Sequence, residues 1–144
     1  MIKMLIQVEA GSRDRKIYNE KTLEFKETQH GTHRYPFSYG FIIGTRSEDG
    51  DCVDCYLITK EKTVAGAIIE CEPVGLLEQH EDDEIDHKIL AVLPGESMHP
   101  SQNDLDDLQA FITTIFSDYP EMNVRVGPVH AREAALNHIR KFEV

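Results

Sequence analysis

The chain has 144 residues, which suits one domain with a hydrophobic core and is too short for two domains of ordinary size. Its 40% hydrophobic and 28% charged residues are typical of a soluble folded protein. The net charge of -11 argues against DNA or RNA as a partner, because nucleic-acid binding relies on Lys and Arg. No apolar run is long enough to span a membrane and no signal-peptide pattern is present, so we expect a cytoplasmic protein.

The three cysteines, Cys52, Cys55 and Cys71, are expected to be free thiols. Cys52 and Cys55 form a C-x-x-C pair, but a structural zinc site needs about four ligands and no second pair exists. A redox dithiol would need a helix start, whereas the surrounding residues are typical of a strand entrance. Zinc and redox roles therefore stay minor alternatives.

The first two thirds of the chain predicts β-strands separated by turns. Two of these strands would form a hairpin around residues 19–21, and the polar residues 27–34 that follow would form a connecting segment. The predicted strands cover residues 4–8, 15–18, 22–26, 35–43, 53–58, 67–72 and 87–92.

The last third of the chain predicts helices. Leu105, Leu108 and Phe111 begin an apolar stripe with helical spacing behind Ser101 or Asn103 as N-cap, and Pro120 would close that helix. A short strand at 123–126 and a helix at 131–142 follow. Without repeats or linkers, residues 1–144 form a single domain in which two helices pack on a curled antiparallel sheet that we expect to be a barrel.

One acidic segment stands out as a candidate metal site. Asp49, Asp51 and Asp54 lie within six residues, and oxygen ligands suit hard cations such as Mg²⁺ and Mn²⁺. On a straight strand Asp54 would face away from the other two, so a turn at Gly50 or a bulge must redirect one of them. The alternative is an exposed acidic hairpin turn. A calcium-binding EF-hand is excluded, since its twelve-residue ligand pattern is missing.

Two further groups carry functional signals. Residues 81–86 are an acidic run that we interpret mostly as a solvated loop. At its end Asp86 and Lys88 share one face of a strand, where they serve either a metal and an anion or an ordinary charge pair. The aromatic residues at 35, 37, 39 and 41 are interpreted mainly as core, and Gly40 marks a close approach of backbone or ligand.

Four motifs together resemble the family I soluble inorganic pyrophosphatases. They are Y-P-x-x-Y-G-F at 35–41, D-G-D-x-V-D at 49–54, P-V-G at 73–75 and D-x-K-I-L-A-V at 86–92, and their order and spacing agree over residues 35–93. The resemblance implies a mainly β protein with α-helices, built as an OB-like five-stranded closed β-barrel with two C-terminal helices. It also implies several Mg²⁺ ions, hydrolysis of pyrophosphate to two phosphates, and a homo-oligomer, usually a hexamer in bacteria.

The same resemblance implies roles for individual residues. Asp51 would be the general base for the attacking water. The metal ligands would be Asp49, Asp54, Asp86 and Glu81, with Asp82 or Asp83 as substitutes for Glu81. The phosphates would be bound by Lys16, Tyr39, Lys88 and Tyr119.

The chain departs from the family pattern around these residues. Gln7 replaces a Glu, Tyr18 replaces another Glu for which Glu20 is a possible substitute, and Pro120 replaces a phosphate-binding Lys. A phosphate-binding Arg is also missing; Lys26 is nearest to its position by spacing and Arg34 by residue type. Cys52 replaces the usual Pro, and Glu72 stands where an Arg is common. The chain is also shorter than most members at both ends.

These departures predict a slower or weaker-binding enzyme, because removal of a charged group that binds a phosphate costs a few kcal/mol of transition-state stabilisation. Two alternatives stay open. One is a metal-dependent hydrolase of another, nucleotide-type diphosphate. The other is a non-catalytic OB-like binding subunit that kept the metal site.

Overall fold

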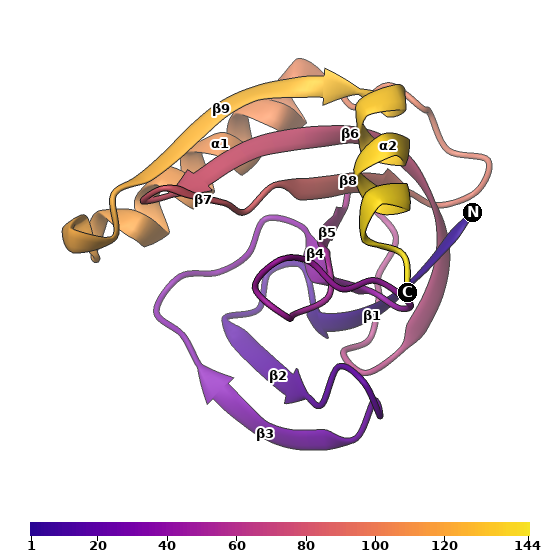
Figure 1. Cartoon of the computed structure of the whole chain (residues 1–144), viewed down its shortest axis with the longest axis horizontal. Coiled ribbons are helices and arrows are strands. Elements are labelled where there is room, and N and C mark those ends of the chain that lie inside the picture. The colour runs from indigo at the N-terminus through magenta and orange to yellow at the C-terminus, as the bar shows by residue number, and fades with distance from the viewer.

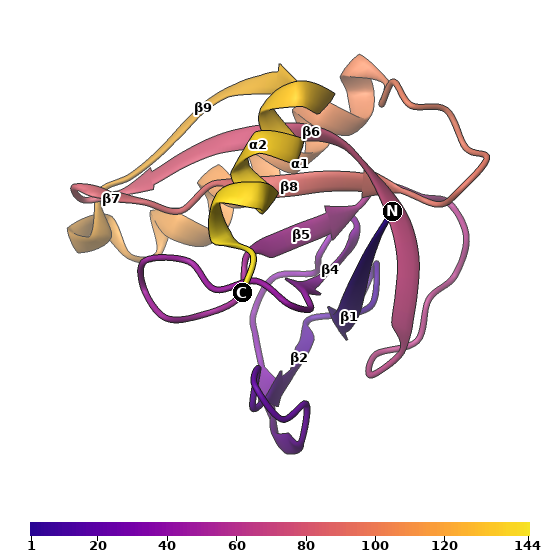
Figure 2. The same cartoon turned by 45° about the vertical axis from the view of Figure 1, so that its right-hand side comes forward.

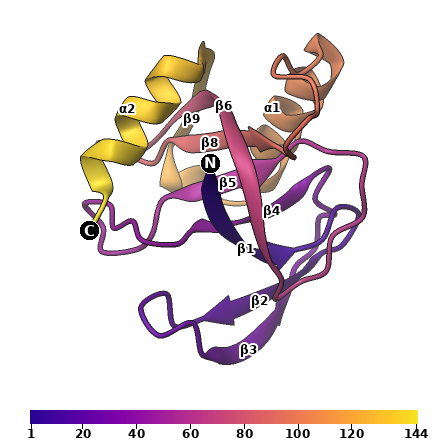
Figure 3. The same ribbon diagram turned by 90° about the vertical axis from the view of Figure 1, so that its right-hand side faces the viewer.

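The computed structural model describes residues 1–144, and its centre is a ring of five strands (Figure 3). Pairing between the first and the last member closes the ring. In order around the ring the strands are β1 (Ile2–Val8), β4 (Ser38–Ile42), β5 (Asp54–Leu57), β8 (Lys88–Val92) and β6 (Ile68–Glu81). The predicted five-stranded closed barrel is therefore confirmed, although its wall is uneven: β6 has 14 residues and β5 has 4.

All neighbours in the ring pair antiparallel except β5 and β8, which are parallel. The prediction of an antiparallel sheet is wrong at this one pair. A tight hairpin can join only antiparallel strands, whereas β5 and β8 are separated in the chain by the whole of β6. The long excursion through β6 brings the chain back to run beside β5 in the same direction.

Strand β6 continues beyond the ring and supports a second layer. Its far end pairs with the short β7 (Glu84–Ile85) and with β9 (Val124–Ala131), which lies along its outer edge (Figure 1). The strands predicted at 67–72 and 123–126 are therefore both real, but each is only the first part of a longer strand. This layer places residues 78–87 beside the end of the barrel.

A separate two-stranded sheet lies against the barrel below β1 (Figure 1), formed by β2 (Asp14–Tyr18) and β3 (Phe25–His30). The predicted hairpin is confirmed. Its second strand begins at Phe25 rather than Thr22 and includes residues 27–30, which the sequence had predicted to be a connecting segment. All six residues of β3 are exposed, so the strand lacks the alternation of apolar and polar residues that marks a half-buried strand.

Two helices cover different sides of the β6–β9 layer (Figures 2 and 3). The first, α1 (Gln102–Ser117), begins as predicted at Ser101, whose side chain accepts a hydrogen bond from the backbone N–H of Asp104. It ends three residues before Pro120, which instead starts a short 3-10 helix, η1 (Pro120–Met122). The second, α2 (Arg132–Phe142), matches its predicted range. None of the helices is long and apolar enough to cross a lipid bilayer.

The barrel core is apolar and closely packed, and the three cysteines in it are buried free thiols. α2 places Ala135 and Ile139 on one side of this core, and α1 places Leu108, Phe111 and Ile112 on the other. Gly40 of β4 lies where β1 approaches most closely, since a Cβ atom there would be 1.8 Å from the carbonyl oxygen of Leu5. This close contact holds β4, and with it Tyr39, against β1.

Candidate active site

The acidic segment forms a tight turn closed by its own side chains. One carboxylate oxygen of Asp49 accepts hydrogen bonds from the Ser47 hydroxyl and, at 2.9 Å, from the backbone N–H of Asp51. Gly50 has a φ of +89°, a conformation that favours glycine. The turn at Gly50 thus reverses the chain just before Asp54 begins strand β5.

Lys88 joins this segment to the acidic run before β8. Its ammonium nitrogen lies 2.5 Å from Oδ2 of Asp54 and 3.1 Å from Oδ1 of Asp86. The parallel pairing of β5 and β8 sets Asp54 beside Lys88, because their successors Cys55 and Ile89 are direct partners.

The lysine is charged although it is almost completely enclosed. Lys88 is only 6% exposed, and burial by itself lowers the pKa of an ammonium group. The negative charges of Asp54 and Asp86 nevertheless raise the pKa of Lys88 well above its usual value. The site therefore holds a fixed positive charge between two carboxylates.

Tyr39 lies between two cations. The Nζ of Lys88 is 5.9 Å and the guanidinium carbon of Arg15 is 5.4 Å from the centre of its ring. Burial, together with the charge of Asp54, raises the pKa of Tyr39 well above its usual value. The phenol therefore stays protonated and can donate a hydrogen bond to an anion.

Arg15 is a site residue that the sequence prediction missed, because the prediction chose its neighbour Lys16. Its Nε is buried without a partner, and although burial opposes it, Tyr39, Tyr35 and Asp54 raise the pKa of the guanidinium. Side chains alternate between the two faces of a strand, so Lys16 does not join Arg15 beside Tyr39. The spacing of the motifs does not distinguish Arg15 from Lys16. Only the orientation of β2 against the barrel shows which of the two side chains faces Tyr39.

The acidic groups carry more negative charge than the two cations balance. Burial raises the pKa of Asp51, with Asp49 and Asp54 adding to the effect. Burial also raises the pKa of Asp86, which Lys88 counteracts and Asp54 reinforces. A divalent cation would relieve this repulsion, and oxygen donors of this kind suit a hard cation.

Glu20 is a second residue drawn into the site, from the loop between β2 and β3. Its Oε1 accepts a hydrogen bond from the backbone N–H of Cys52 at 2.9 Å. Burial raises the pKa of Glu20, and the nearby Asp51 and Asp54 raise it further. The acid that the sequence named as a substitute for the Glu expected at Tyr18 thus reaches the acidic segment.

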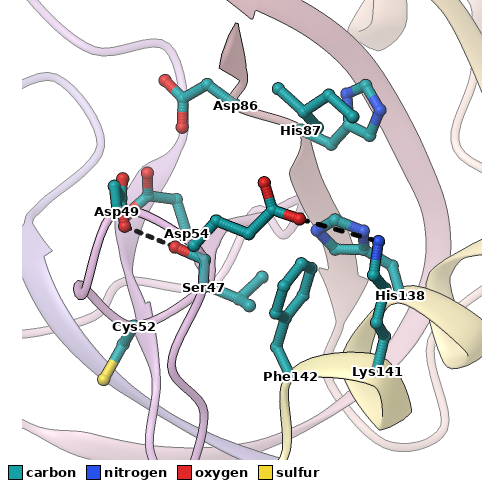
Figure 4. A pocket seen from close by; sticks show the side chains of 12 residues that line it. Ser47, Asp49, Cys52, Asp54, Asp86, His87, His138, Lys141 and Phe142 are labelled. Atoms are coloured by element: carbon teal, nitrogen blue, oxygen red, sulfur yellow. Dashed lines mark hydrogen bonds and ion pairs between the residues drawn. The ribbon is translucent and has the colours of Figure 1, made fainter.

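The predicted metal ligands Asp49, Asp54 and Asp86 line one cavity (Figure 4). Asp49 and Asp54 lie on one side of it, and side chains of α2, including Lys141 and Phe142, lie on the other. Glu81 is at the end of β6, where burial raises its pKa and Asp86 contributes to the shift. Glu81 does not line this cavity.

Tyr119 lies on the opposite side of the site, just after α1, and is 53% exposed. It shares a second cavity with Arg15, Tyr35 and Arg13. The predicted residues therefore fall into two parts: a group of acids around Lys88, and a more open, cationic side to which Arg15 belongs.

Several departures from the family pattern have structural partners of their own. The amide of Gln7 donates to the carbonyl of Lys16 at 3.1 Å, while its own oxygen is buried without a partner. Arg34 donates to the carbonyl of Gly11 at 2.8 Å, and Lys26 lies on the exposed strand β3. Glu72 is paired with Arg132. None of these contacts brings a cation to Tyr39.

Comparisons with known proteins point to one family. A family model described as inorganic pyrophosphatase matches residues 3–143. An inorganic pyrophosphatase of Nanoarchaeum equitans is 35% identical over 149 residues, covering 96% of this chain and 92% of that protein. One from Aquifex pyrophilus is also 35% identical, over 118 residues that cover 74% of this chain and 66% of the Aquifex protein.

The fold is shared with solved structures. The inorganic pyrophosphatase of Helicobacter pylori superimposes with a TM-score of 0.84 at 24% identity, covering 97% of this chain and 89% of that one. The family model spans nearly the whole chain, and the alignment with the Nanoarchaeum relative covers 96% of it. This chain therefore belongs to the inorganic pyrophosphatase family.

Proposed function

We propose that this protein hydrolyses inorganic pyrophosphate to two phosphates with the help of Mg²⁺. The observation that carries the proposal is the buried Lys88, held between Asp54 and Asp86 and against the ring of Tyr39. Carboxylates that can hold a metal and cations that can hold a phosphate meet there. Phosphoryl transfer requires mainly this combination of positioning and charge neutralisation.

The acidic residues would have two roles, metal binding and proton transfer. Asp49, Asp54, Asp86 and Glu81 would hold the metal ions, and bound Mg²⁺ would neutralise phosphate charge and lower the pKa of a water molecule. Asp51 would accept the proton of that water. Its pKa is raised by burial and by its acidic neighbours, which improves the carboxylate as a base near neutral pH.

The phosphate groups would be bound by Lys88, Tyr39 and Tyr119, with a further cation from β2. The sequence predicted Lys16 for that last role. The position of Arg15 over the Tyr39 ring, with an unpartnered Nε, favours Arg15 instead. A guanidinium can also contact two phosphate oxygens at once.

Three finer points belong to the same proposal. The working ion is Mg²⁺, with Mn²⁺ as the alternative, since all the proposed ligands are carboxylates and both ions bind oxygen donors. We also propose a cytoplasmic homo-oligomer, a hexamer by resemblance to the family. Light scattering on the purified protein, with and without Mg²⁺, measures the oligomer directly.

The proposal is tested by phosphate release from pyrophosphate in the presence of Mg²⁺. We expect Asp51→Asn and Asp54→Asn to lower the rate by about 10²-fold or more. Asp107→Asn is the matched control, because Asp107 is an exposed acid on α1. Absence of release by the unaltered protein, or equal rates for all variants, would refute pyrophosphate hydrolysis.

The same assay addresses the alternative substrate. Pro120 leaves the cationic side with one Lys fewer than the family pattern, next to the exposed Tyr119. This opening is the feature that favours a larger, nucleotide-type diphosphate. Faster release from ADP than from pyrophosphate would assign that substrate, and slower release would reject it.

A further inference from the structure

A second group of side chains that could hold a metal ion adjoins the carboxylate centre. Glu78 and His80 of β6, together with His87 just before β8, each place one ligand atom within 4.8 Å of the others. Glu78 and His80 are two residues apart on a strand and so share a face. The antiparallel pairing of β6 with β8 brings His87 to them. All three residues are partly buried.

The ring of His87 is held against the backbone of Gln79. Its Nδ1 lies 3.1 Å from the carbonyl oxygen and 3.0 Å from the backbone nitrogen of Gln79. Nδ1 accepts the hydrogen bond of the Gln79 N–H in one tautomer, and in the other it donates to the Gln79 carbonyl, which leaves the Nε2 lone pair free for a metal. A hydrogen bond from the second ring nitrogen to a backbone carbonyl is the usual support of a histidine ligand.

More imidazoles surround this group. The ring of His80 is 5.2 Å from that of His87, and the ring of His138 on α2 is 5.6 Å from His87 on another side. His130 of β9 has its Nε2 3.7 Å from a carboxylate oxygen of Glu78. His130 of β9 and His138 of α2 therefore lie next to the group formed by Glu78, His80 and His87.

We propose that Glu78, His80 and His87 bind one divalent transition-metal ion of the zinc class. Two imidazoles and one carboxylate suit Zn²⁺ or Co²⁺, with His130 next to Glu78 as the nearest further donor. This donor set differs from the all-oxygen set around Asp54. The two sites are neighbours, because His87 lines the same cavity as Asp49, Asp54 and Asp86.

A metal in this site would stabilise the acidic turn at residues 81–86 by linking its two ends. It would tie β6 to the residue that precedes β8, across the base of residues 81–86, which contain the exposed β7. Because the bound ion favours the folded state, the thermal midpoint should rise as its concentration increases. The site does not depend on the proposed hydrolysis.

The test is a Co²⁺ titration of the whole protein in excess Mg²⁺, which keeps the all-oxygen centre filled. Co²⁺ bound by imidazoles in a tetrahedral site absorbs visible light strongly, whereas six oxygen ligands give only weak bands. We expect saturation at one equivalent, competition by Zn²⁺, and a higher melting temperature. Asp54→Asn should bind Co²⁺ as the unaltered protein does.

The variants separate this group from the exposed histidines. His80→Ala and the isosteric Glu78→Gln should each weaken Co²⁺ binding at least tenfold. His99→Ala, which removes an exposed histidine outside the group, should not change it. Circular dichroism establishes that each variant is folded, and Glu78→Gln keeps the shape of the side chain.

Three results would overturn the proposal. They are the absence of saturable Co²⁺ binding in excess Mg²⁺, a bound-ion spectrum with only weak bands, and unchanged affinity in both folded variants. Loss of phosphate release without any change in Co²⁺ binding would concern the carboxylate centre alone. Such a result would leave the proposal of a site at Glu78, His80 and His87 unaffected. Failure of the hydrolysis proposal and failure of this one are therefore distinguishable.

Discussion

The wall of the barrel and the β2–β3 hairpin contribute to the same site under different constraints. The wall supplies Tyr39, Asp54 and Lys88 from three adjacent strands that are almost completely buried. The hairpin supplies Arg15 and its loop supplies Glu20, although every residue of β3 is exposed. Tyr39, Asp54 and Lys88 match the family pattern on the wall, whereas the departure at Tyr18 lies on the hairpin.

Packing accounts for this difference. Any substitution of Lys88 leaves the carboxylates of Asp54 and Asp86 without their partner, and an enclosed charge without a partner is costly. Loss of Arg15 from the partly buried β2 leaves no enclosed carboxylate pair without its partner and weakens mainly the interaction with the ligand. Substitutions in the acidic centre therefore reduce both stability and function, whereas substitutions on the cationic side reduce mainly function.

The largest effect is expected on the wall. Lys88→Met should reduce phosphate release by about 10²- to 10³-fold, because it removes a buried charge that faces the substrate. Lys62→Met is the control, since Lys62 is an exposed cation in a loop. A Lys88→Met protein that keeps a tenth of the activity would show that the wall is no more essential than the hairpin.

The wall should also be the more sensitive region in stability. Gly40→Ala would set a Cβ atom 1.8 Å from the carbonyl oxygen of Leu5, and we expect a loss of about 3 kcal/mol in the free energy of unfolding. Gly95→Ala tests backbone conformation alone, because φ there is +88° and no atom lies within 4 Å. It should cost about 1 to 2 kcal/mol. Urea unfolding of both variants measures the difference, and equal losses would contradict the close approach of β1 to β4.

On the hairpin, two adjacent residues should differ. Arg15→Ala should raise the KM for pyrophosphate about 10- to 100-fold, the effect of losing a charged hydrogen bond. Lys16→Ala should leave the KM within about twofold, since Lys16 does not face Tyr39. Steady-state kinetics at saturating Mg²⁺ decides between them. The reverse order would restore the role that the sequence predicted for Lys16.

The smallest effect is expected at the hairpin loop. Glu20→Gln should raise the Mg²⁺ concentration for half-maximal activity about tenfold, because Glu20 supports the acidic segment through the backbone of Cys52. Glu24→Gln alters an exposed acid of the same loop and should change nothing. The Mg²⁺ dependence of phosphate release at fixed pyrophosphate measures both variants. An unchanged Mg²⁺ requirement in Glu20→Gln would show that Glu20 does not contribute to metal binding.

Much of the fold was predictable because its signals are local. The apolar stripe and the cap at Ser101 predicted α1, and alternating or continuous apolar runs predicted the strands of the ring. The exposed β3 carries no such pattern, and the parallel pairing of β5 with β8 depends on residues far apart in the chain. Neither feature can be deduced from the neighbouring sequence.

The site was predictable to the same extent. The motifs named Asp54, Asp86 and Lys88, which the structure brings into direct contact. The motifs did not name Arg15, because a shift of one residue along a strand moves a side chain to the other face. The histidine group was missed for a different reason: Glu78, His80 and His87 come together only when β6 folds back on β8.

Closure of the ring has a consequence for how the nascent chain folds during synthesis on the ribosome. Ile2 at the very start of β1 pairs with Cys71 in β6, so the hydrogen-bonding edge of the first strand is left open until the middle of the chain has been made. Open strand edges attract other chains, and late, distant pairings slow folding. We expect nascent chains that stop before β6 to associate with chaperones, and chains released after it to fold without them.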